Sequence, residues 1–158
     1  MQIILAVFPK FDDAKEAVRY MLTENVEESD INAVTQDWVF KSHTDADLGA
    51  INVEITQMPP GLERILGGEQ PIDLPDTGSV YAAGKKATVL AKNATDSGSG
   101  FKVTLQEFGV PEKAAEGIQE AIRNGGVLLW VAVDEAKAPT VGDIFKLNNA
   151  HHITTPAG

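Results

Sequence analysis

Seven consecutive apolar residues occur late in the chain, in the run Val127-Leu128-Leu129-Trp130-Val131-Ala132-Val133. The run has the length of a strand, and because it contains no polar residue, both faces of that strand must be buried. A second run of this kind, Ile3-Ile4-Leu5-Ala6-Val7-Phe8, lies near the N-terminus. Burial on both faces is commonest at the centre of a sheet, so we expect the two strands to lie side by side there.

Each run begins a β-α-β pattern. The first leads through a helical stretch, residues 12–24, to a strand at 31–35 that can continue through 38–40. The second leads through residues 139–150 to a strand at Ile153. Two such halves predict an α+β protein built as an α/β sandwich. The first helix has an apolar stripe at helical spacing, formed by Ala14, Ala17, Val18, Met21 and Leu22.

The chain has 158 residues, of which 43% are hydrophobic. This size and composition suit one domain, residues 1–158, with a core of its own. We divide it into a first β-α-β half (1–40), an insertion (41–109) and a last part (110–158) that holds a helix and the second β-α-β half. Pro111 starts that helix, and its apolar face consists of Ala114, Ile118, Ala121 and Ile122.

The insertion is rich in polar residues, proline and glycine. Residues 51–55 alternate in polarity like a half-exposed strand, and residues 62–66 have the pattern of a short helix. The prolines and glycine between 71 and 78 indicate a loop, and the alanine-rich stretch from 80 to 94 favours helix. Residues 101–108 fit a helix or a strand, and we favour the helix.

The charge balance limits the kinds of partner. Lys and Arg number 13 against 23 Asp and Glu, which gives 13 − 23 = −10. Such a surface repels phosphate backbones and anionic membranes, so we expect no nucleic-acid binding. The chain has no Cys, hence no thiol chemistry, and no apolar run approaches a membrane span of about 18 residues. We expect a cytoplasmic protein without a signal peptide or stable membrane insertion.

Three features of the sequence are candidates for sites of chemistry. His151 and His152 are adjacent, and adjacent residues on a strand point to opposite faces, so we expect no metal site. The segment Gly78 to Thr88 has five residues between its glycines, and Lys86 stands where a phosphate loop has Ser or Thr. We therefore expect no nucleotide site. A spacing of four residues separates Glu112, Glu116 and Glu120, so we expect these side chains to form the solvent-exposed face of a helix. No catalytic, cofactor or metal residue is assigned, which favours a protein that is not an enzyme.

Several short segments resemble the bacterial general stress protein 17M-like, or heat-induced YflT-like, family. These segments span most of the chain in the family's order: Val7-Phe8, Asp13-Ala14, Ala17-Val18, Ser29-Asp30-Ile31, Gly78 to Gly84, Phe108 to Ala114 and Gly125 to Leu128. The resemblance implies a ferredoxin-like β-α-β repeat with a helical or irregular insertion between its halves. It also implies a stress-associated role, for which the family has no established biochemistry.

We therefore expect a stress-associated protein that acts by self-association or partner binding. One layer of helices covers one sheet face, and the second face of the 127–133 strand then needs a cover, which either the middle segment or a second subunit can supply. The middle segment is polar and broken by proline and glycine, so we favour the second subunit. This argument predicts a homodimer with Trp130, Leu128 and Ala132 as interface residues. The alternative is a protein that binds or converts a small molecule, in a pocket between the sheet and the insertion.

Overall fold

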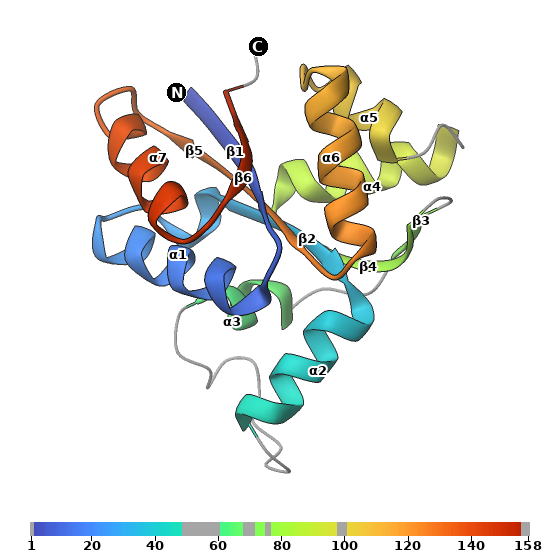
Figure 1. The fold of residues 1–158 in the computed structure, drawn as a ribbon, viewed down its shortest axis with the longest axis horizontal. Coiled ribbons are helices and arrows are strands. Elements are labelled where there is room, and N and C mark those ends of the chain that lie inside the picture. Colours follow the sequence, from blue (N-terminus) through green and yellow to red (C-terminus); the bar gives the residue numbers. More distant parts are fainter. Residues whose placement is uncertain (1, 49–60, 68–71, 75–76, 98–100, 156–158) are drawn as a thin grey trace.

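The computed structural model describes residues 2–48, 61–67, 72–74, 77–97 and 101–155. Within these residues, six strands form one antiparallel sheet with helices on both faces, so the protein has an α+β fold (Figure 1). The elements follow in the order β1 (Gln2–Phe8), α1 (Phe11–Thr23), a 3₁₀ turn (Glu28–Asp30), β2 (Ile31–Gln36), α2 (Asp37–Leu48), α3 (Leu62–Gly67), β3 (Ile72–Leu74), β4 (Gly78–Ala83), α4 (Lys85–Ser97), α5 (Phe101–Glu107), α6 (Glu112–Arg123), β5 (Val127–Val133), α7 (Ala138–Leu147) and β6 (His151–Thr154).

The two apolar runs are neighbouring interior strands of the sheet, as the sequence predicts, although β1 lies next to the edge strand β6 rather than at the centre. The strand order is β3-β4-β2-β5-β1-β6, and β1 pairs antiparallel with β5 from Gln2 opposite Val133 to Phe8 opposite Val127. In the sheet, β5 lies between β1 and β2 of the first β-α-β unit, and β1 lies between β5 and β6 of the second unit. Each unit therefore has one strand of the other unit between its own two strands. This arrangement is compatible with the expected ferredoxin-like repeat, which β4 and β3 of the insertion extend at one edge.

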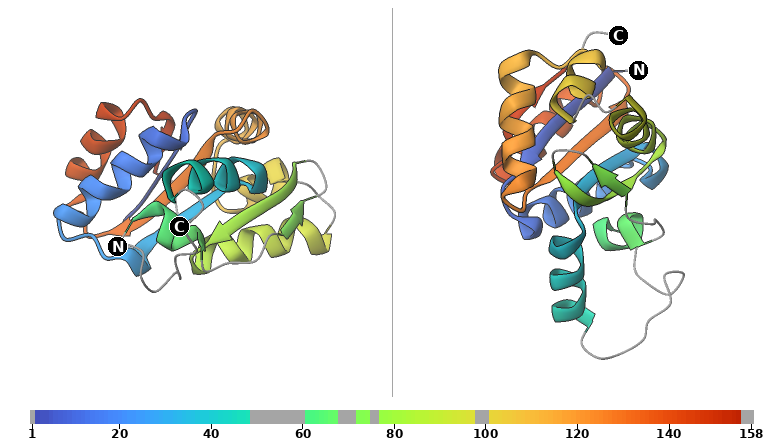
Figure 2. Two further views of the ribbon diagram at one scale, coloured as in Figure 1. Left: turned by 90° about the horizontal axis from the view of Figure 1, so that it is seen from below. Right: turned by 90° about the vertical axis from the view of Figure 1, so that its right-hand side faces the viewer.

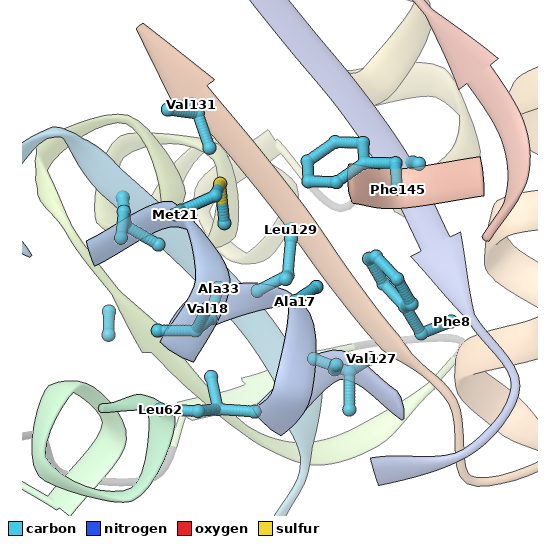
Figure 3. Close-up of a cluster of buried hydrophobic side chains, with 14 of the residues drawn as sticks. Phe8, Ala17, Val18, Met21, Ala33, Leu62, Val127, Leu129, Val131 and Phe145 are labelled. Carbon is cyan, nitrogen blue, oxygen red and sulfur yellow. The ribbon is translucent and has the colours of Figure 1, made fainter. Parts of the chain in front are cut away.

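The alternation of side chains along the strands divides the core into two clusters. Even-numbered residues of β1 and odd-numbered residues of β5 belong to the first-face cluster, which α1, α3 and α7 cover (Figure 3). Leu5 and Val7 of β1, with Leu128 and Trp130 of β5, belong to the second-face cluster under α4, α5 and α6. The predicted helix stripes are buried, since Ala14, Ala17, Val18 and Met21 lie in the first cluster and Ile118 and Ile122 in the second.

The premise of the predicted homodimer is wrong. The second face of β5 needs no second subunit, because α4 and α5 of the insertion and the neighbouring α6 cover it within one chain. Leu128 is 0% exposed and Trp130 is 4% exposed, while Ala132, near the end of the strand, is partly exposed. Self-association itself stays a prediction, but the exposure of Trp130, Leu128 and Ala132 no longer supports it.

Two local predictions are wrong in a similar way. Residues 38–40 do not prolong β2 but belong to the first turn of α2, which extends away from the rest of the chain (Figure 2). Residues 80–83 are strand β4 rather than helix, and α4 begins only at Lys85. Apolar and aromatic residues suit either element, and the choice at 80–83 comes from pairing with β2, residues 33–36, which is remote in sequence.

The rest of the insertion follows the predictions in part. The short helix predicted at 62–66 is α3, and the helix favoured at 101–108 is α5. The segment expected to be a loop contains the short edge strand β3. The strand predicted at 51–55 lies outside the described residues. Within the described part of the chain, no helix combines the length and apolar character needed to cross a membrane.

Candidate ligand pocket

A cavity lies between the second face of the sheet and the insertion helices. Its empty volume, including the part open to solvent, is about 420 Å³. Ile3 and Leu5 of β1 and Trp130 of β5 form its floor, since alternate residues of the strands share that face. The remaining lining comes from the helices and the connection between α5 and α6: Lys86, Leu90, Leu105, Phe108 and Val110. The cavity is therefore apolar except for one amine.

Asn32 connects the floor of this cavity to the start of α4. Its side chain is buried on β2, directly opposite Trp130, and its amide nitrogen donates a hydrogen bond to the Trp130 carbonyl oxygen at 3.4 Å. The Asn32 Oδ1 atom accepts hydrogen bonds from the backbone N–H groups of Lys86 at 3.0 Å and Ala87 at 3.3 Å. A side chain from a distant strand thus caps α4 and holds its first turn over the sheet.

Gly84 permits this contact. Its φ angle of +97° is one that residues with a Cβ rarely adopt, and a Cβ at this position would collide with the Asn32 carboxamide. The sequence shows Gly84 as part of the segment that resembles a phosphate loop. In the structure the first free N–H groups of α4 are already bonded to Asn32, so this glycine serves an internal cap.

Of the described residues that line the cavity, Lys86 alone is ionisable. Its side chain is exposed to solvent at the mouth. Ion pairs are formed by Arg19, Lys41, Arg64 and Lys102, and no ion pair of Lys86 is found among the described residues. The cavity can therefore offer an apolar interior and a single positive charge at its entrance.

A second, more polar pocket lies between α6 and β6, with an empty volume of about 670 Å³ that includes open solvent. His151 and His152 both line it, which corrects the expectation that they face opposite sides. The pairing of β6 with β1 is irregular here, and His152 has a positive φ of 56°. Such a bulge redirects a side chain, and the polar residues beside the two imidazoles are Glu120 of α6 and Asn124, which directly follows that helix.

Gly117 makes room for the second pocket. A Cβ on this residue of α6 would collide with the His152 ring, although glycine inside a helix costs about 1 kcal/mol relative to alanine. The sequence offered one signal of this contact, a glycine in the middle of an otherwise regular helix. Among the described residues, no three His, Cys, Asp or Glu side chains form a group that could hold a metal ion.

The remaining sequence candidates have structural surroundings of their own. Glu112 and Glu116 lie on the exposed face of α6 and form ion pairs with Lys102 at 3.6 and 3.8 Å, so that face is solvated as expected. Trp130 was expected to pack in a core or an interface, and it both joins the second-face cluster and borders the cavity. Sequence reasoning did not single out Asn32, whose polar side chain between apolar neighbours was the available signal.

Comparison of the chain with protein-family models, curated proteins and solved structures gives no match.

Proposed function

We propose that this protein binds a small, largely apolar molecule in the cavity between the sheet and the insertion helices. The observation that carries the proposal is the cavity lining, in which apolar side chains from β1, β5, α4 and α5 surround one concave space. Binding sites for small molecules are typically cavities of about 300 to 1,000 Å³ with mostly apolar linings and few polar groups. The space in this cavity that a water-sized sphere can reach is about 50 Å³, which is below that range, so the cavity suits only part of a small ligand.

This proposal follows the second of the two functions expected from the sequence. Self-association had its support in an uncovered sheet face, and that support is gone because the insertion helices cover the face. The resemblance to the general stress protein family still implies a bacterial, cytoplasmic and stress-associated setting. We keep that setting as part of the proposal.

Tryptophan fluorescence provides a direct test. The chain has two Trp residues, and only Trp130 borders the cavity, while Trp38 is 55% exposed on α2. In the Trp38→Phe variant the emission therefore reports on the cavity alone. We expect octan-1-ol and toluene to shift or quench this emission in a saturable manner. Absence of any change with both compounds at millimolar concentration contradicts the proposal.

A pair of filling variants locates the binding site. Ile3→Phe enlarges a partly exposed side chain of the lining, so it should fill the cavity and weaken octan-1-ol binding by about tenfold or more. Val103→Phe makes a similar enlargement on the exposed side of α5, away from the lining, and should leave the affinity unchanged. Equal effects of the two variants would place the binding elsewhere.

A further inference from the structure

The charge at the mouth of the cavity identifies the class of ligand, an inference that rests on the proposed function. Among the described residues that line the cavity, all except Lys86 are apolar and none is a carboxylate. The chain as a whole carries a net charge of −10, so carboxylates are abundant. A lysine that has no ion-pair partner among the described residues is therefore notable beside an apolar cavity.

The position of Lys86 adds to its positive potential. The residue lies in the first turn of α4, a helix of 13 residues, and the N-terminal end of a helix carries a partial positive charge. The N–H groups of Lys86 and Ala87 already donate to Asn32 Oδ1, so they are not available to a ligand. An anionic group at the mouth would therefore be bound by the Lys86 ammonium rather than by the backbone.

The two properties together describe an amphipathic anion. We propose that the ligand is a small monocarboxylate whose apolar part packs on Trp130, Leu90 and Leu105 and whose carboxylate pairs with the Lys86 ammonium. A lysine presents its charge on a flexible stem, which suits a head group that remains partly in water. The modest volume favours a short alkyl chain or a single ring over a long acyl chain.

The test compares three probes that share an apolar tail and differ in head group: octanoate, octan-1-ol and octylammonium. Trp130 emission is followed in the Trp38→Phe background. We expect octanoate to bind about tenfold more tightly than octan-1-ol, the effect of one charge-assisted hydrogen bond, and octylammonium to bind most weakly. The preference for octanoate should decrease with added salt, since the head group is exposed.

Two lysine variants test whether the Lys86 ammonium is the charge that binds the carboxylate. Lys86→Met should lower octanoate affinity about tenfold and leave octan-1-ol affinity within about twofold. Lys92→Met removes the same charge from an exposed position further along α4 that does not line the cavity, and it should change neither affinity. Circular dichroism verifies that both variants are folded, as expected for exposed side chains.

The outcomes separate the two proposals. If octan-1-ol and octanoate bind equally well and Lys86→Met changes neither, the cavity binds apolar molecules but the carboxylate inference is wrong. The inference is equally wrong if octanoate does not bind while octan-1-ol does, or if Lys92→Met has the same effect as Lys86→Met. If no probe changes the emission of Trp130, the proposed function itself fails.

Discussion

The two faces of the sheet are covered in different ways. On the first face, helices α1 and α7 belong to the β-α-β units themselves, and large side chains meet directly, as where the rings of Phe8 and Phe145 pack edge to face with centroids 5.4 Å apart (Figure 3). On the second face, the insertion supplies α4 and α5, and α4 presents the small residues Ala87, Ala91 and Ala94. The cavity beside Trp130 lies on this second face. The comparison indicates that the cavity lies on the face that α4 and α5 of the insertion cover together with α6.

The largest expected difference between the faces comes from one kind of substitution made on each. Leu129→Ala removes a fully buried side chain from the first-face cluster and should cost about 4 to 5 kcal/mol. Leu90→Ala enlarges the existing cavity on the second face, which water can enter, and should cost about 2 to 3 kcal/mol. Urea denaturation of both variants measures the difference. Equal losses would mean that the two faces are equally well packed.

A pair of glycine substitutions, one on each face, should change the free energy of unfolding by an intermediate amount. Gly84→Ala should destabilise the protein by about 2 to 3 kcal/mol, because the positive φ disfavours alanine and the added methyl group collides with Asn32. Gly142→Ala is the control on the first face, within α7, where an added Cβ meets no atom within 4 Å. It should stabilise by up to about 1 kcal/mol.

Thermal unfolding of the two glycine variants gives the comparison directly. If Gly84→Ala were as stable as Gly142→Ala, the bond between Asn32 and the start of α4 would not hold the insertion in place. The positioning of Lys86 would then need another explanation.

The smallest expected effect concerns the outer surface of the second face. Lys102 forms ion pairs with Glu112 and Glu116, whose side chains are 70% and 67% exposed. Solvent screens such pairs, so Lys102→Ala should change the free energy of unfolding by about 0.5 kcal/mol or less, and any change should fall with added salt. A loss above about 1 kcal/mol would show that these contacts hold the insertion helices together more strongly than surface pairs normally do.

The elements that were predicted correctly are those whose pattern of apolar residues lies within one short segment. The runs at 3–8 and 127–133 are apolar at every position, and the helix stripes repeat at 3.6-residue spacing, so burial could be inferred from each segment alone. The errors at 38–40 and 80–83 have a common cause. Those residues suit either element by composition. At 80–83 the pairing with residues 33–36, which are far away in the chain, decides for strand.

The candidate site was predictable only in outline. A pocket between sheet and insertion was one of the two expected functions, and Trp130 was among the residues singled out. Lys86 lines the cavity and is held in place by the bond from its backbone N–H to Asn32, and these two residues are separated by 54 positions. No local pattern in the sequence connects them.

The amino-acid sequence by itself determined that the chain has two β-α-β halves, two doubly buried strands and an acidic surface, because composition and periodicity are properties of neighbouring residues. Only the tertiary structure decided which helices cover the second face, where a cavity remains, and which charge stands at its mouth. It also decided that His151 and His152 share one pocket, through an irregularity in strand pairing. These features depend on how side chains of distant segments fit together, and fit in three dimensions is set by packing rather than by the pattern of any one segment.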